Sequence, residues 1–478
     1  MKKILKNVLD WLSTKASYAD IRFVQLEEEK IVAENGILSS YNLSTDRGVG
    51  IRVLANGAWG FASTYDLREE ILLKTAEKAL KIAQASTLCK KDDIQLAPQD
   101  KQLDKYITPI YKDPFQVSSA EKIDLLVKST KAMLKDKVKK SEGVLNFFKT
   151  FKIFISTEGS EIEQTIFESG GGINAYAIGE RDFQRRSYPS SFDGDYATRG
   201  YEFIEEMDLL KNAERIAEEA NQLLVAPYAP EGVMDIVLGG SQLALQVHES
   251  CGHPAELDRV LGKEISFAGG SFLTLDKLNT FTYGSSQVNI VADATVPGGL
   301  GTFGFDDEGV PASRSYLVKQ GKFVGYLTSR EDAFKLGIPS NGAARAQSWN
   351  HIPLVRMTNI NLLPGNFGWD ELLDGIKKGL YLDCNKSWSI DDKRLNFQFG
   401  TEIAREVKNG KVGKWYKNAF YQGITPEFWK SCDGVADQKY WRVWGVNNCG
   451  KGQPEQLMHV GHGTSPARFR KIKVGASR

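Results

Sequence analysis

The stretch that most constrains the fold is Leu243-Ala-Leu-Gln-Val-His248-Glu249-Ser-Cys-Gly-His253. The chain has only five histidines, and two of them flank a glutamate here. Neutral imidazoles are good ligands for Zn²⁺, and a carboxylate beside the metal can take the proton of a bound water as that water attacks a carbonyl. The residue types therefore predict a metal site with His248 and His253 as ligands and Glu249 as general base.

The spacing of the two histidines predicts an irregular helix. Two side chains at positions i and i+5 lie about 140° apart on a regular α-helix, compared with about 40° at i and i+4. Because side chains so far apart cannot share one ion, we expect a π-bulge or a helix end within the motif, and Gly252 is suited to that break. The alternative is two unrelated histidines on a short helix, which leaves Glu249 on an otherwise apolar turn without an explanation.

Catalytic zinc sites usually have three protein ligands and keep the fourth position for water or substrate. Cys449 lies in the glycine-rich stretch 445–453, where the backbone can approach an ion closely. A cysteine in such a loop is, taken alone, more often structural than a ligand. The residues alone leave the third ligand open among Cys449, His351, His459, His462, Cys251 and Glu256, although burial is the expected role of Cys251.

The first half of the chain alternates helix-like and strand-like segments. Asn56-Gly57 is a strong hairpin signal. Hydrophobic spacing predicts an amphipathic helix at the N-terminus and three later helices, whereas β-branched and aromatic residues predict the strands between them. The predicted helices are 67–85, 120–134 and 206–224, and the predicted strands are 19–25, 30–42, 48–62 and a group within 143–179.

A change of composition marks a predicted domain boundary. The stretch 226–232 contains two prolines and a glycine and cannot continue the preceding helix. We therefore expect one domain over residues 1–226 and a second over 227–478. The second is mostly strands and turns, as in the hairpin-like stretch 315–327, with helices expected only at 241–251 and 369–379. The fold class predicted for the whole chain is α+β.

Composition excludes several classes of protein. Lys plus Arg is 61 and Asp plus Glu is 60, so the charge balance gives no support for nucleic-acid binding, which usually needs a basic excess. No run approaches the ~18 apolar residues of a membrane helix, and Lys6 and Asp10 interrupt any signal-peptide core. The five cysteines are odd in number and scattered. They predict reduced thiols or a metal ligand, and therefore a cytoplasmic protein.

Several ordered motifs resemble the TldD/PmbA family of metallopeptidases. The segment from His248 to Asp258 resembles the HExxxH segment of that family, and Phe305-Asp-Asp-Glu-Gly309 resembles its DDEG turn. Cys449-Gly-Lys-Gly-Gln453 is similar to its C-terminal cysteine segment. Further similar stretches are Gly325-Tyr-Leu327, Asn350 to Asn359 and Leu363-Pro-Gly365, with a looser likeness at 48–62.

The resemblance implies an α+β fold with a Zn²⁺ site in the C-terminal domain, Cys449 as the third ligand, and peptidase activity on unfolded or flexible peptides. It also implies that residues 1–226 form the walls of a peptide-binding dimer cavity. Members pair as a homodimer or as a heterodimer of TldD-like with PmbA-like subunits, and PmbA-like chains lack the metal motif. This chain therefore resembles the TldD type. Ser250-Cys251 and Pro254-Ala255 depart from the commonest form, which leaves substrate preference and pairing mode open.

Other features are given structural interpretations. Gly299-x-Gly301-x-x-Gly304 formally matches a dinucleotide fingerprint, but a turn follows it where a helix would be required. The acidic residues 306–308 are expected in a solvated turn, and His459 and His462 in structural or substrate-contact roles. Trp415, Trp429, Trp441 and Trp444 are expected in the core or at a dimer face.

Three alternative functions follow from the same residues. A metal-dependent amidase acting on a non-peptide substrate would use the same site. A non-catalytic interaction subunit with a structural zinc would need a fourth ligand such as His351 or Glu256. Modulation of DNA gyrase, an older association of the family, is not supported by the near-zero net charge of the chain.

Overall fold

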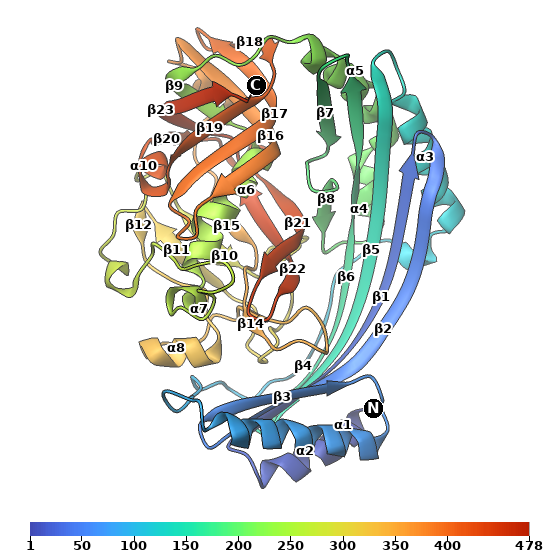
Figure 1. Cartoon of the computed structure of the whole chain (residues 1–478), viewed down its shortest axis with the longest axis vertical. Coiled ribbons are helices and arrows are strands. Elements are labelled where there is room, and N and C mark those ends of the chain that lie inside the picture. Colours follow the sequence, from blue (N-terminus) through green and yellow to red (C-terminus); the bar gives the residue numbers. More distant parts are fainter. Residues whose placement is uncertain (478) are drawn as a thin grey trace.

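A long curved sheet forms the first part of the molecule (Figure 1). The computed structural model describes residues 1–477. The sheet has eight strands in the order β3-β2-β1-β5-β6-β4, with β7 and β8 also paired to β6. Its strands are β1 (Tyr18–Glu34), β2 (Ile37–Ala55), β3 (Ala58–Thr64), β4 (Leu103–Ile107), β5 (Val138–Ser156), β6 (Glu161–Ile178), β7 (Phe183–Tyr188) and β8 (Asp195–Ala197).

The helices of the first half cover the two ends of this sheet. The apolar face of α1 packs with that of α2 against β1, β2 and β3, and α3 and α5 share a second core with β5 and β6. The helices are α1 (Lys2–Ser13), α2 (Glu69–Ser86), η1 (Pro114–Gln116), α3 (Ser119–Ala132), α4 (Glu202–Met207) and α5 (Leu209–Val225).

Two turns in this half differ from the prediction and one confirms it. The hairpin at Asn56-Gly57 is present, with φ of 51° and 73°. The predicted strand 30–42 is wrong, because Asn35 and Gly36, with φ of 52° and 78°, form a turn within it. The predicted helix 206–224 is broken at Asp208, whose φ of 51° is left-handed.

The second half contains a large mixed sheet and three smaller ones. Seven strands form the large sheet, β16-β9-β23-β19-β17-β18 with β20 on β23, and the others are β12-β11-β10-β15, β13-β14 and β21-β22. The strands are β9 (Gly232–Leu238), β10 (Ile290–Asp293), β11 (Arg314–Lys319), β12 (Lys322–Phe323), β13 (Ala344–Arg345), β14 (Leu354–Val355), β15 (Ile360–Leu362), β16 (Lys378–Ile390), β17 (Asn396–Lys408), β18 (Lys411–Tyr416), β19 (Ala419–Ile424), β20 (Cys432–Val435), β21 (Arg442–Lys451), β22 (Gln456–Thr464) and β23 (Ala467–Ala476).

The α+β class predicted from the sequence is therefore confirmed, but helices in the second half were missed. One helix that was not predicted is α8, which begins after the N-cap residue Ser329 and ends at Gly337, whose backbone is left-handed. Because α8 is short, its sequence shows no clear hydrophobic period. No helix within residues 1–477 is both long and apolar enough to span a membrane. The helical segments are α6 (Gly240–Val247), η2 (His248–Gly252), η3 (His253–Ala255), α7 (Leu257–Val260), η4 (Leu275–Lys277), α8 (Arg330–Leu336), α9 (Trp369–Leu373), α10 (Thr425–Lys430) and η5 (Gln438–Tyr440).

A buried acidic turn joins the two halves. Asp306, Asp307 and Glu308 are each at most 5% exposed, so the prediction of a solvated turn is wrong. Glu308 accepts a hydrogen bond from Nη1 of Arg52 at 2.9 Å, and Asp307 accepts one from Nζ of Lys152 at 3.2 Å. Arg52 lies on β2 and Lys152 on β5, so cations of the first sheet neutralise carboxylates of the second half.

We predict that Glu308→Gln lowers the free energy of unfolding by about 3 kcal/mol, because it breaks a buried ion pair. Glu161→Gln is the control, since the pair of Glu161 with Lys6 is partly exposed to solvent and is expected to contribute less than about 1 kcal/mol. Urea unfolding of both variants measures the difference. Equal small losses would show that the buried turn does not stabilise the contact between the halves.

Candidate metal centre

A π-helical turn brings the two motif histidines onto one face. The α6 helix continues into η2 (His248–Gly252), and the N–H of His253 bonds the carbonyl of His248. The wider turn places the two imidazole rings 4.9 Å apart, so the predicted break within the motif is confirmed. A Cβ on Gly252 would lie 2.2 Å from Sδ of Met357, which explains the glycine at this position.

Cys449 reaches the same point from a distant hairpin. It lies on β21, where the register with β22 shifts between Val446 and Cys449. One potential ligand atom from each of His248, His253 and Cys449 lies within 4.8 Å of the others, and Sγ of Cys449 is 3.7 Å from Nε2 of His253. All three side chains are at most 5% exposed. The structure thus brings together the three residues proposed as ligands.

Burial and the charges within the cluster favour a thiolate on Cys449 and a neutral imidazole on His253, but they raise the pKa of His248. Burial raises the pKa of the Cys449 thiol, but the charges of His248, His253 and Arg356 outweigh burial and hold that pKa well below its usual value. Burial lowers the pKa of His253 well below its usual value. For His248, burial lowers the pKa, but the charge and hydrogen bond of Cys449 outweigh it and raise the pKa overall. Deprotonated sulfur and neutral imidazole are the forms that bind a metal.

The second nitrogen of each imidazole is also bonded, which fixes the ring orientations. Nδ1 of His462 donates to the carbonyl of Ile360 at 3.3 Å, and this leaves Nε2 of His462 to accept from Nδ1 of His248 at 2.8 Å. Nδ1 of His253 donates to Oε2 of Glu256 at 3.0 Å. Neither of these hydrogen bonds uses Nε2 of His248 or of His253, so Nε2 is the nitrogen that each histidine would offer to an ion, the arrangement usual for metal-binding histidines.

His462 and Glu256 were considered from sequence as direct ligands, but each contacts a ligand imidazole instead. The other sequence candidates lie outside the cluster. His459 pairs with Glu168 at 2.7 Å, and Cys251 is fully buried, as expected. His462 follows His248 by 214 residues, so no local pattern in the sequence marks it as the partner of that imidazole, whereas Glu256 follows His253 by three.

Glu249 is buried beside the cluster and contacts one cation. Its side chain is 7% exposed, and Oε2 accepts from Nη1 of Arg394 at 2.5 Å. Within residues 1–477 no hydrogen bond to Oε1 is found. Sequence reasoning missed Arg394, which lies 145 residues further along the chain in a turn without a motif.

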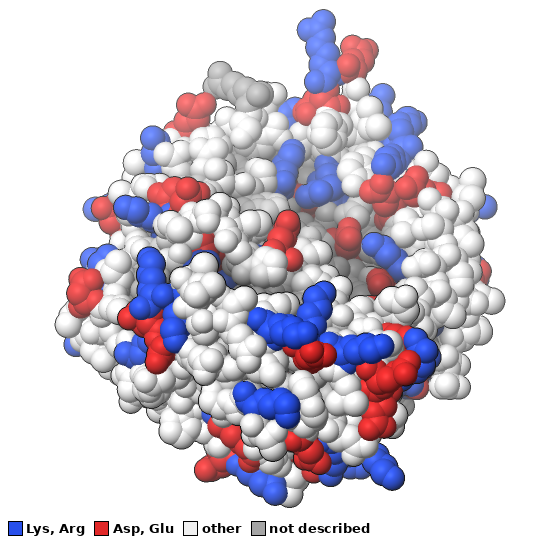
Figure 2. All heavy atoms as spheres, turned by 60° about the horizontal axis from the view of Figure 1, so that its bottom comes forward, with Lys and Arg blue, Asp and Glu red and all other residues white. Residues whose placement is uncertain are grey.

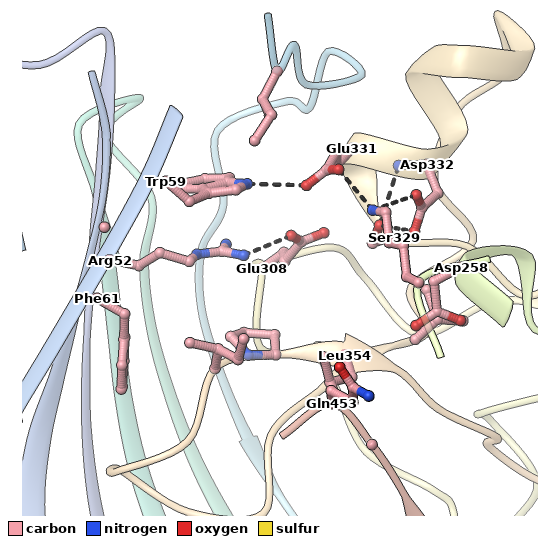
Figure 3. A pocket seen from close by; sticks show the side chains of 17 residues that line it. Arg52, Trp59, Phe61, Asp258, Glu308, Ser329, Glu331, Asp332, Leu354 and Gln453 are labelled. Carbon is pink, nitrogen blue, oxygen red and sulfur yellow. Dashed lines mark hydrogen bonds and ion pairs between the residues drawn. The ribbon is translucent and has the colours of Figure 1, made fainter. Parts of the chain in front are cut away.

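Several cavities lie where the halves of the chain meet, and two of them are lined by residues close to the cluster or to the hairpin that carries Cys449. A cavity of about 390 Å³ is lined by Arg52, Trp59, Asp258 and Glu308, among others (Figure 3). Asp258 connects this cavity to Glu256, the partner of His253. Nζ of Lys451 is 2.6 Å from Oδ1 of Asp258 and 3.4 Å from Oε2 of Glu256. A second cavity, of about 340 Å³, is lined in part by residues of β22. On the face in Figure 2, acidic and basic side chains are interspersed around a hollow, without a continuous basic patch.

Comparisons with known proteins find metalloproteases among the relatives of this chain. A "Metalloprotease" of Methanothermobacter thermautotrophicus is 31% identical over 99% of this chain and 98% of its own length. A "Zinc metalloprotease TldD homolog" of Saccharolobus solfataricus is 23% identical over 96% of this chain and 97% of its own.

Solved structures share the fold. A putative modulator of a DNA gyrase from Thermotoga maritima superposes with a TM-score of 0.78 at 19% identity, over 99% of this chain and 100% of its own. TldE from Thermococcus kodakarensis superposes with a TM-score of 0.71 at 16% identity, over 99% of this chain and 100% of its own.

The names of the relatives indicate that the chain is a metalloprotease, and its fold and its cluster of His248, His253 and Cys449 are compatible with that class. The chain belongs to the PmbA/TldA metallopeptidase family. The family's domain 1 matches residues 19–83, its central domain 112–226, and its C-terminal domain 231–476. The resemblance to TldD/PmbA proteins inferred from the motifs is thus confirmed.

One buried carboxyl near the cluster gives the fold a pH dependence. Glu264 is 1% exposed and accepts from the N–H of Gly452 at 3.3 Å. Burial and the neighbouring charge of Glu256 raise the pKa of Glu264 to about 7, against the opposing effects of Lys451 and Arg259. The folded protein therefore holds this proton more tightly than the unfolded chain does.

We predict that the stability contributed by protonated Glu264 is complete below about pH 4.5 and is lost as the pH rises through about 7. Relative to Glu264→Gln, the metal-free wild type should lose about 2 kcal/mol of unfolding free energy between pH 5 and 8. Urea titrations of both proteins with a chelator present measure this. Parallel pH profiles would show that Glu264 has an ordinary pKa.

Proposed function

We propose that the chain is a zinc-dependent peptidase that hydrolyses unfolded or flexible peptides at the site formed by His248, His253 and Cys449. The observation that carries the proposal is the buried cluster of two imidazoles and one thiol next to the carboxylate of Glu249. Such a donor set suits Zn²⁺, and three ligands leave a position for water or substrate. The printed name of one relative includes zinc, which supports the choice of metal.

Different residues of the chain would serve different steps of the hydrolysis. Zinc bound there would polarise the scissile carbonyl and lower the pKa of a bound water. Glu249, whose Oε1 has no hydrogen bond within residues 1–477, would accept a proton from that water and return it to the leaving amine. His462 and Glu256 would hold the imidazoles of His248 and His253 in fixed orientations.

The alternatives are less well supported. A structural zinc would need four protein ligands, and within residues 1–477 the cluster has three His, Cys, Asp or Glu members. His351 and Glu256, the proposed fourth ligands, are not among them. An amidase with a non-peptide substrate would use the same residues, and only substrate profiling separates it from a peptidase.

We further propose a cytoplasmic protein that pairs as a homodimer or with a PmbA-like subunit. The structural likeness to TldE supports pairing within this family. We also propose that residues 1–226 and 227–478 act as separate domains, since no sheet within the described residues contains strands of both.

We predict that the wild type contains about one zinc per chain and that Cys449→Ser loses it, because the substitution removes the thiolate ligand. Elemental analysis of the purified proteins measures the content. Cys89→Ser, which removes an exposed thiol, is the control and should keep the metal. Zinc retained in Cys449→Ser would mean that the third ligand is another residue.

We predict that Glu249→Gln keeps its zinc but hydrolyses unfolded casein at least about 100-fold more slowly, since the variant lacks the base. Glu427→Gln, at an exposed glutamate of α10, is the matched control. The initial rate of peptide release, measured alongside zinc content, tests this. Unchanged hydrolysis in Glu249→Gln would refute the role of Glu249.

A further inference from the structure

Arg394 lies in a firmly held turn between β16 and β17. Its φ is 63°, a left-handed conformation that is uncommon for a residue with a side chain. The N–H of Arg394 donates to the carbonyl of Asp391 at 2.8 Å, and Oγ1 of Thr425 donates to the carbonyl of Arg394 at 2.9 Å. Oδ1 of Asp391 accepts from the N–H of Leu395 at 2.7 Å. The backbone alone therefore fixes where the Arg394 side chain starts.

Among residues 1–477, the side chain of Arg394 forms one hydrogen-bonded ion pair, and its partner is Glu249. Nη1 is 2.5 Å from Oε2 of Glu249, whereas Nε is buried without a hydrogen-bond partner among residues 1–477. Arg259 provides a contrast nearby, because its Nη1 donates to the carbonyls of Ala268 and Gly270 and so holds loops together. Because backbone hydrogen bonds already hold the turn, the guanidinium of Arg394 is available to bind Glu249.

Holding one carboxylate oxygen has a defined effect on the other. The terminal torsion of a glutamate is broad, so an unheld carboxylate samples many orientations. With Oε2 of Glu249 bonded to Arg394, rotation of the carboxylate is restricted, so Oε1 is held in one position as well. Catalytic efficiency is sensitive to such placement, and a 1 Å error can cost on the order of 100-fold in rate.

We infer that Arg394 is a positioning residue that holds Oε2 of Glu249 and thereby presents Oε1 to the reacting water. The inference rests on the proposed peptidase function. A purely structural role would make Arg394 important for stability only. A positioning role makes it important for the rate of the chemical step, with substrate binding and metal content unchanged.

The kinetic test compares Arg394→Met and Arg394→Lys with the wild type. We expect Arg394→Met to keep its zinc and a KM within about twofold while kcat falls roughly 10- to 100-fold, the range found when an outer-shell partner is removed. Arg394→Lys should recover part of the loss, because it keeps a donor cation. Lys393→Met, which removes the exposed neighbouring cation in the same turn, is the control and should leave kcat unchanged.

A second test needs no activity. In the metal-free protein, Arg394→Met should lower the Tm in the wild-type background, where it leaves the buried Glu249 unpaired, and should lower it much less in the Glu249→Gln background. Equal shifts in both backgrounds would overturn the inference, as would a kcat within threefold of the wild type in an active, zinc-loaded Arg394→Met.

The two tests also separate this inference from the proposed function. A wild type that binds no zinc and hydrolyses no peptide would overturn the proposed function, and with it the positioning role, even if the thermal coupling were present. An active wild type with unchanged kcat in Arg394→Met would overturn the inference alone.

Discussion

The widened turn from His248 to Gly252 is the constraint on which the rest of the site depends. On a regular helix the two imidazoles would point about 140° apart and no ion could lie between them. Core aromatic residues hold the turn in place: Nε1 of Trp429 donates to Oγ of Ser250 at 2.9 Å, and the hydroxyl of Tyr283 donates to the carbonyl of Ser250 at 2.9 Å. The hydrophobic core thus holds the backbone conformation that the proposed metal chemistry requires.

Burial of the ligands brings charges into the interior, and these charges need partners. Glu256, which orients His253, has no exposure, and Lys451 lies 3.4 Å from its Oε2. Lys451 also contacts Asp258, so one buried cation serves two buried carboxylates. Lys451 follows Cys449 by two positions on the same strand. The strand that delivers the thiol therefore also delivers the cation, which couples the placement of the ligand to the neutralisation of its surroundings.

Sequence alone predicted some of the features that depend on neighbouring residues, although it missed the turn at Asn35-Gly36. The break within the helix follows from the i, i+5 spacing and a glycine, and the hairpin at Asn56-Gly57 from its turn residues. Features that depend on distant partners were missed. Glu308 looked solvent-exposed because its partner Arg52 lies 256 positions away, and Arg394 had no local signal to connect it with Glu249. The fold topology determines which distant residues meet, and the topology cannot be deduced from the local patterns of a single sequence.

The first sheet supports the proposed metal centre without supplying one of its three residues. His459 on β22 is paired with Glu168 on β6 at 2.7 Å, so the first sheet holds the β21-β22 hairpin from one side. Arg185 on β7 contacts Glu402 on β17 at 2.6 Å, so the sheet is bonded to the second half at another point as well. Because Cys449 lies on β21, paired with β22, a shift of the first sheet would move the hairpin that carries the thiol. The N-terminal half is therefore part of the scaffold of the centre, in addition to any part it has in binding a peptide.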